Sequence, residues 1–185
     1  WDFWGVPGHP DKIIAGTYSS LLLFKKRPGR EIQFMKIIEG FSESSREMAF
    51  HHGVLWMTHG YKGVYKINFN ETFDKVVDYE LYGEKHGFPS DFGITVHTFK
   101  NELIFSTDNG FYYYDAEVDS FYEHSYLINL IGREKVNKKF YEDQSGNIWI
   151  FQGGALKILR LKYDGSYEHE KIPFLELKET FIYSF

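Results

Sequence analysis

Cysteine is absent from this sequence of 185 residues, which excludes disulfides and thiolate metal sites. The absence does not settle the compartment, since many exported bacterial domains also lack cysteine. No apolar run approaches the roughly 18 residues that a membrane-spanning helix needs. No block of Lys or Arg stands out, and 21 basic against 26 acidic residues leave a net charge of -5. We therefore expect this chain neither to insert into a membrane nor to bind nucleic acid.

Aromatic side chains, in contrast, are abundant: 14 Tyr, 18 Phe and 4 Trp make up 19% of the chain. Hydrophobic residues in total reach 43%, which is too apolar for a disordered chain and enough to build a core. Aromatic residues favour strands and the packing of large, shape-specific surfaces. The composition therefore indicates a folded protein rich in β-strands.

One phrase recurs along the chain, and it is clearest in DQSGNIWIFQGGALKIL at residues 143–159. Aligning the copies places an apolar residue in one shared slot, at steps of 42, 48 and 45 residues: Ile14, Trp56, Ile104 and Trp149. A short turn follows each slot, and a second apolar run then opens at Leu21, Val64, Phe111 and Leu156. Each copy therefore predicts a strand, a tight turn and a second strand.

Flanking β-rich runs add two strands to each copy, which makes four strands in about 45 residues. A sheet that is apolar on both faces must stack on copies of itself, as the blades of a β-propeller do. The sequence predicts an all-β chain of about four four-stranded antiparallel blades, at residues 1–40, 41–83, 84–130 and 131–177. The start of a further strand is expected at 178–185. A β-sandwich or barrel also has short strands at such spacing, but four copies in phase favour the propeller.

Residues 111–131, FYYYDAEVDSFYEHSYLINLI, are the most helix-like part of the sequence. Their content of Tyr and Phe nevertheless favours strand, and we predict strand here.

The segment at 143–158 resembles the two-component regulator propeller repeat, whose pattern is Asp-x-x-Gly-Asn-h-Trp-h-Gly-Thr. The matching residues are Asp143, Gly146, Asn147 and Trp149, whereas Phe151 and Gln152 depart from the Gly-Thr pair. The segment STDNGFYYYD matches the second half of the pattern, with Ile104 in place of Trp. Residues 82–99 resemble the linker that joins such repeats, and its Gly-h-Pro-Ser core lies at 87–90.

The resemblance implies the sensor region of bacterial hybrid two-component histidine kinases or of triple-tyrosine regulators. It implies a non-catalytic propeller of about seven blades in the periplasm, as part of an inner-membrane protein. Its expected partners are a neighbouring propeller and an immunoglobulin-like module of the parent chain, and the parent is expected to be a homodimer. No cofactor is implied. The chain begins at Trp1 without a leader and stops within ETFIYSF, so we expect it to be part of a longer protein.

Metal and catalytic sites are weakly supported by the sequence. His51 and His52 are adjacent and should point to opposite faces of a strand, and His59 lies one strand away, so no metal site is predicted. An enzyme would need paired carboxylates, and turn chemistry already explains most candidates. These candidates are Glu43, Asp74, Asp91, Asp108, Asp115 and Asp143.

Ligand-binding residues are expected in the loops that differ between copies, because such loops carry function more often than the shared framework does. Aromatic and charged groups there suit an oligosaccharide or another polar small molecule. The candidates are Tyr18, Arg46, His59, Tyr61, Lys62, Asp91 and Arg133. The sequence thus favours a ligand-sensing propeller without enzyme activity. A carbohydrate-active propeller hydrolase or lyase and a protein-interaction scaffold remain as alternatives.

Overall fold

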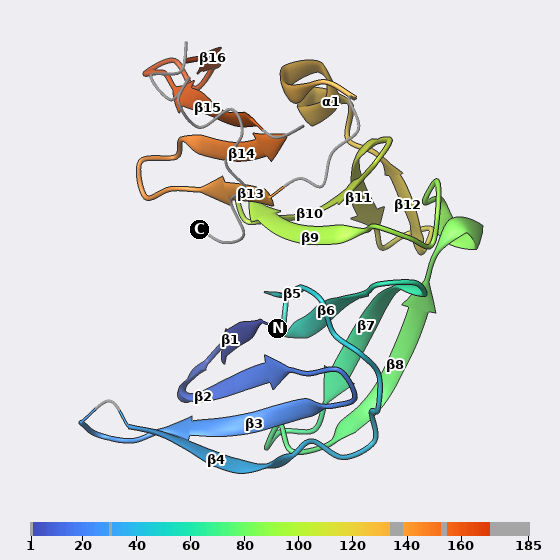
Figure 1. Ribbon diagram of the computed structural model, residues 1–185, viewed down its shortest axis with the longest axis vertical. Coiled ribbons are helices and arrows are strands. Elements are labelled where there is room, and N and C mark those ends of the chain that lie inside the picture. Colours follow the sequence, from blue (N-terminus) through green and yellow to red (C-terminus); the bar gives the residue numbers. More distant parts are fainter. Residues whose placement is uncertain (1, 30, 134–138, 153–154, 171–185) are drawn as a thin grey trace. The chain divides into compact units, whose positions relative to one another are not determined.

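The computed structural model describes residues 2–29, 31–133, 139–152 and 155–170. The strand expected at 178–185 lies outside these residues. The chain divides into two compact units, Trp1–Val96 and His97–Phe185. The described residues form four antiparallel four-stranded sheets (Figure 1). The chain is therefore all-β and built of propeller-type blades, as predicted.

The first unit holds two sheets, each with its strands in chain order. The first sheet consists of β1 (Phe3–Val6), β2 (His9–Gly16), β3 (Leu21–Lys26) and β4 (Ile32–Ile37). The second consists of β5 (Met48–His51), β6 (Val54–His59), β7 (Gly63–Phe69) and β8 (Val76–Tyr82). A short 3-10 turn, η1 (Glu84–His86), follows β8.

The remaining two sheets have the same up-and-down order. The third consists of β9 (Thr95–Phe99), β10 (Glu102–Thr107), β11 (Gly110–Asp115) and β12 (Ser120–Glu123). Helix α1 (Ser125–Ile131) follows it. The fourth sheet consists of β13 (Lys139–Glu142), β14 (Ile148–Gln152), β15 (Ala155–Leu161) and β16 (Tyr167–His169).

The shared slot occupies one position in all four sheets. It lies on the second strand, and its cross-strand partners on the third strand are Leu23, Lys66, Tyr113 and Ile158. The residue two places beyond the slot pairs in every sheet with the first residue of the second apolar run. These pairs are Gly16–Leu21, Thr58–Val64, Ser106–Phe111 and Phe151–Leu156. The predicted hairpin phase is confirmed in all four copies.

Burial between successive sheets holds each unit together. In the first unit, Ile14 from the first sheet shares one core cluster with Leu55 and Met57 from the second. In the other unit, Ile104 shares a cluster with Ile148 and Ile150 of the following sheet. The slot residue of one sheet thus packs on the residues that flank the slot of the next. This packing removes from water the apolar faces that no single sheet could cover.

The prediction of strand through residue 131 is wrong for its last part, because Ser125–Ile131 form helix α1. Leu127, Ile128 and Ile131 are buried, and this i, i+1, i+4 spacing gives the helix one apolar face. The His124 imidazole accepts a hydrogen bond from the Leu127 N–H at 3.2 Å and caps the helix start. Burial and the cap together override the strand preference of the aromatic residues.

Candidate functional site

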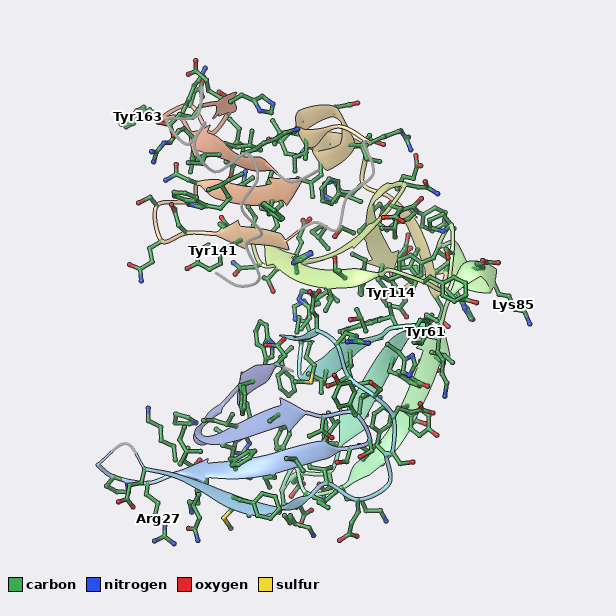
Figure 2. All side chains as sticks on the ribbon, viewed as in Figure 1. Arg27, Tyr61, Lys85, Tyr114, Tyr141 and Tyr163 are labelled. Atoms are coloured by element: carbon green, nitrogen blue, oxygen red, sulfur yellow. The ribbon has the colours of Figure 1, made fainter. Side chains whose placement is uncertain are left out.

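Four of the predicted ligand-binding residues come together in the first unit, at the turn between β6 and β7. His59 ends β6, Tyr61 and Lys62 form the turn, and Arg46 lies in the segment that leads to β5. Figure 2 shows the Tyr61 side chain at this end of β6 and β7. Glu43, from the same segment as Arg46, also reaches the turn. We call these five residues the β6–β7 loop cluster.

An ion pair between Glu43 and Lys62 anchors the turn. The Lys62 ammonium donates to Oε1 and Oε2 of Glu43 at 2.9 and 2.8 Å. These bonds hold the pKa of Glu43 below its usual range, against the opposing effect of burial. The carboxylate is therefore ionised at neutral pH, and the charge of Lys62 is compensated inside the protein.

His59 is held in one orientation beneath the turn. Its Nδ1 accepts a hydrogen bond from the backbone N–H of Tyr61 at 3.0 Å, which places the proton of the neutral ring on Nε2. Nε2 lies 3.8 Å from Oε2 of Glu43. Burial lowers the pKa of His59, and the positive charges of Lys62 and Arg46 add to this effect, while Glu43 opposes it. The imidazole is therefore neutral at pH 7 and fixes the turn.

Three aromatic rings, those of Phe41, Tyr65 and Tyr79, pack against one another beside Glu43 of the cluster. The ring centroids of Phe41 and Tyr65 lie 5.2 Å apart, and those of Phe41 and Tyr79 also lie 5.2 Å apart, edge to face. Burial raises the pKa of Tyr65, and the hydrogen-bonded charge of Glu43 raises it further. Tyr65 therefore stays protonated and uncharged, and its hydroxyl group is hydrogen-bonded to Glu43.

A second aromatic pair, Tyr61 and Phe92, is more exposed. Tyr61 is 69% exposed and Phe92, in the segment after η1, is 59% exposed. Their ring centroids lie 6.4 Å apart with the ring planes inclined by 69°. An exposed aromatic pair beside charged groups is the arrangement that polar ligands with apolar faces use.

The other predicted site residues have different surroundings. Tyr18 is exposed on the β2–β3 turn, and this turn is joined to the cluster segment by a bond from the Ser45 N–H to the Thr17 carbonyl at 2.9 Å. Asp91 accepts the N–H of Glu84 at 2.8 Å and so holds the turn η1 in place.

Arg133 belongs to the second unit. Its guanidinium donates to both carboxylate oxygens of Glu123, at 2.5 and 2.7 Å, and this pairing raises the pKa of Arg133 and lowers that of Glu123. A ligand for Arg133 would have to compete with this carboxylate.

The histidines differ in detail from the sequence-based expectation. His51 ends β5, but His52 lies in the following turn with φ of 48°, and their rings approach to 4.1 Å. The expectation that they point to opposite faces is wrong, because the turn leaves the strand geometry after His51. Among the residues that the structure describes, no three His, Asp or Glu side chains form a group able to hold a metal ion.

Turn chemistry accounts for several of the candidate carboxylates. Asp143 accepts the N–H groups of Ser145 and Asn147, both at 2.9 Å, and Asp115 accepts that of Glu117 at 2.9 Å. Hydrogen bonds from Thr72 and Asn70 hold the pKa of Asp74 at about 2. Most of their bonds thus go to their own turns, while Asp143 also accepts from Trp149 on β14 and Asp74 also pairs with Lys36 on β4.

Glu43, Tyr65 and Phe92 were not among the sequence-based binding candidates. Glu43 lies 19 residues from Lys62 in the chain, so their pairing becomes visible only once β6 and the preceding segment are in place. Tyr65 and Phe92 sit in segments whose aromatic content resembles that of the other strands and linkers. In the sequence, only the position of Glu43 near Arg46 in the charged segment SESSRE could have marked Glu43 as a site residue.

Comparisons with known proteins bear on the architecture. No protein-family model and no curated protein match the sequence. Among solved structures, the chain is similar to the extracellular domain of the hybrid two-component system BT3049 from B. thetaiotaomicron, with a TM-score of 0.53 and 17% identity over 86% of this chain. The likeness is one of fold. The chain spans 23% of the length of that structure. No helix in the described part of the chain is long and apolar enough to cross a membrane.

Proposed function

We propose that this chain is part of the ligand-sensing propeller of a bacterial two-component regulator, acts outside the cytoplasm and has no enzyme activity. The observation that carries the proposal is the β6–β7 loop cluster, which presents exposed aromatic and charged groups from a fixed turn. The fold that the chain shares with an extracellular domain of a hybrid two-component system supports the same role. A periplasmic location, a propeller and an immunoglobulin-like module as neighbours, and a homodimeric parent belong to this proposal.

The electrostatics of the cluster support the proposal of binding without turnover. A glycosidase needs two carboxyl groups, one of which has a raised pKa so that it can donate a proton. Glu43 is the single carboxylate among the five cluster residues, and its pKa is lowered by Lys62. Glu43 therefore stays ionised and bonded to Lys62, and it has no proton to give to a leaving group.

Signalling would require two states of the parent protein with different affinity for the ligand. The apolar packing between successive sheets leaves little room for deformation within a blade pair. Ligand binding at the loops would therefore shift the position of whole blades or units. The bound ligand would be a small molecule or an oligosaccharide.

A binding and turnover experiment on the full chain tests this proposal. A panel of soluble oligosaccharides is screened by thermal shift, and each hit is incubated with the protein and assayed for released reducing ends. We expect saturable stabilisation by at least one glycan without turnover, and loss of this effect in Tyr61→Ala. Arg27→Gln serves as the control, because Arg27 is an exposed residue at the far end of the same unit (Figure 2).

Three results would contradict the proposal. Release of reducing ends would favour the alternative of a carbohydrate-active enzyme. Stabilisation that persists in Tyr61→Ala would place the binding site elsewhere in the chain. A chain that binds no glycan but forms a stoichiometric complex with a purified module of its parent would favour the scaffold.

A further inference from the structure

Arg46 is the uncompensated positive charge of the loop cluster. Lys62 is bonded to both carboxylate oxygens of Glu43, whereas Arg46 makes no ion pair with any residue that the structure describes. The nearby His59 adds no charge at neutral pH, since burial and both cations lower its pKa. The cluster therefore carries one net positive charge on a chain whose formal charge is -5.

Arg46 is an exposed residue, and its guanidinium lies against the bare backbone of Gly60. A Cβ atom at position 60 would approach Nε of Arg46 to 3.3 Å and a terminal guanidinium nitrogen to 3.6 Å. The absence of a side chain at Gly60 leaves the guanidinium in place beside the turn. Tyr61, the residue that follows Gly60 in the turn, exposes its ring and pairs with Phe92.

Extending the proposed ligand-binding role, on which this inference rests, we propose that the loop cluster recognises an acidic sugar unit of an oligosaccharide. Arg46 pairs with the carboxylate or sulfate of that sugar, and Tyr61 packs on the C–H face of its ring. The planar guanidinium fork matches both anions with two parallel hydrogen bonds. An aromatic ring supplies the apolar contact that a sugar face requires. A neutral sugar has no anionic group that could form an ion pair with Arg46.

Titration calorimetry with the full chain at an ionic strength of about 0.15 M tests this assignment. The probes are trigalacturonic acid, a sulfated chondroitin disaccharide, neutral maltotriose and sodium sulfate. We expect at least one acidic glycan to bind about tenfold more tightly than maltotriose or free sulfate. The two acidic probes distinguish a carboxylate from a sulfate preference, and sodium sulfate distinguishes a sugar site from a site for free anions.

Variants assign the effect to named residues. Arg46→Gln should weaken the acidic glycan about tenfold, and Arg46→Lys, which keeps the charge but not the fork, about threefold. Tyr61→Ala should weaken it as well. Arg27→Gln, which removes an exposed arginine from the β3–β4 turn, should leave the affinity unchanged. Circular dichroism confirms that each variant is folded.

The outcomes separate this inference from the proposal beneath it. The acidic-sugar assignment is wrong, and the sensor proposal stands, if maltotriose binds, Tyr61→Ala abolishes its binding and Arg46→Gln leaves its binding unchanged. If sodium sulfate binds as well as the glycans, the site is one for free anions and the assignment is again wrong. If none of the three glycans binds, the assignment falls, and the sensor proposal is judged on the wider panel.

Discussion

Replacing Asp143 by Ala or Asn tests the turn between β13 and β14, the first two strands of the fourth sheet. One carboxylate there accepts four hydrogen bonds. Oδ1 accepts the N–H groups of Ser145 and Asn147, both at 2.9 Å, and Oδ2 accepts the side-chain amide of Asn147 at 3.0 Å and the indole N–H of Trp149 at 2.9 Å. The repeat pattern Asp-x-x-Gly-Asn-h-Trp thus describes a single closed turn.

The size of the effect follows from which donors lose their acceptor. Ser145 is exposed, so its N–H returns to water, whereas Asn147 is buried and Trp149 is half-buried. At about 1 kcal/mol for each net hydrogen bond, the three bonds from Asn147 and Trp149 give roughly 3 kcal/mol. The indole bond is the largest cause that lowers the pKa of Asp143 from 3.8 to about 2. At about 1.4 kcal/mol per pKa unit this shift corresponds to roughly 2 kcal/mol. Solvent screening at this partly exposed carboxylate reduces that value, so we expect Asp143→Ala to cost about 1–2 kcal/mol of unfolding free energy.

The pH dependence gives the sharper test. Since the pKa of Asp143 is lower in the folded state, its stabilisation is fully present above the pKa of the unfolded chain, near 4, and is lost as the pH falls through about 2. Asp143→Asn keeps the shape of the side chain and removes the charge. The difference in unfolding free energy between wild type and Asp143→Asn should therefore be largest at neutral pH and shrink steadily from about pH 5 to about pH 2.

Urea unfolding, followed by tryptophan fluorescence at several pH values, measures this difference. Asp108→Asn is the matched control, because Asp108 is an exposed turn residue of the same unit whose side chain bonds to none of the described residues. The control should stay within about 0.5 kcal/mol of wild type. A pH-independent loss in Asp143→Asn would show that the charge of the carboxylate does not close the turn.

Three further outcomes are expected. Trp56→Ala should cost about 3–5 kcal/mol in urea unfolding, because Trp56 is 3% exposed, and a cost near that of a surface substitution would contradict the packing of the slot. Gly16→Ala should lower the melting temperature, because its Cβ would lie 1.9 Å from Oγ of Ser45, and Ser45→Gly should restore most of the loss. Glu43→Gln should tighten trigalacturonic acid about threefold in calorimetry by releasing the charge of Lys62, and weaker binding would instead assign Glu43 to the ligand.

Much of the fold could be predicted because the repeat shows both how side chains alternate between the faces of a strand and in which register the strands of each hairpin pair. Residues that face one side of a strand recur at every second position, so one aligned slot determines the phase of all four hairpins. Helix α1 was missed because its signal is short. Three buried residues and one cap from His124 outweigh the strand preference of the neighbouring aromatics only when a surface is present to bury them.

Four of the five cluster residues could be predicted from residue types in loops that differ between copies, including Arg46 in the segment before β5. His59, Tyr61 and Lys62 share one turn, and its extra residue relative to the other copies drew attention to them. Glu43 contacts this turn across 19 residues of the chain, and a local sequence pattern does not predict such a contact. Asp91 and Arg133 are of the expected residue types in the expected loops, but each is bonded to another residue of the chain, and sequence alone does not show such pairing.

The framework also determines how firmly Arg46 is presented to a ligand. Its own N–H donates to the Thr58 carbonyl at 2.9 Å, and the preceding Ser45 N–H donates to the Thr17 carbonyl at 2.9 Å. Two residues after Arg46, the Met48 N–H donates to the carboxylate of Asp2 at 3.0 Å. Three directional hydrogen bonds therefore fix the backbone around Arg46. Two of them go to residues that flank strands of the first sheet, Thr17 after β2 and Asp2 before β1. A guanidinium on such a backbone loses little main-chain entropy on binding, and this preorganisation is the reason to look for the ligand contact here rather than at a lysine on an unanchored loop.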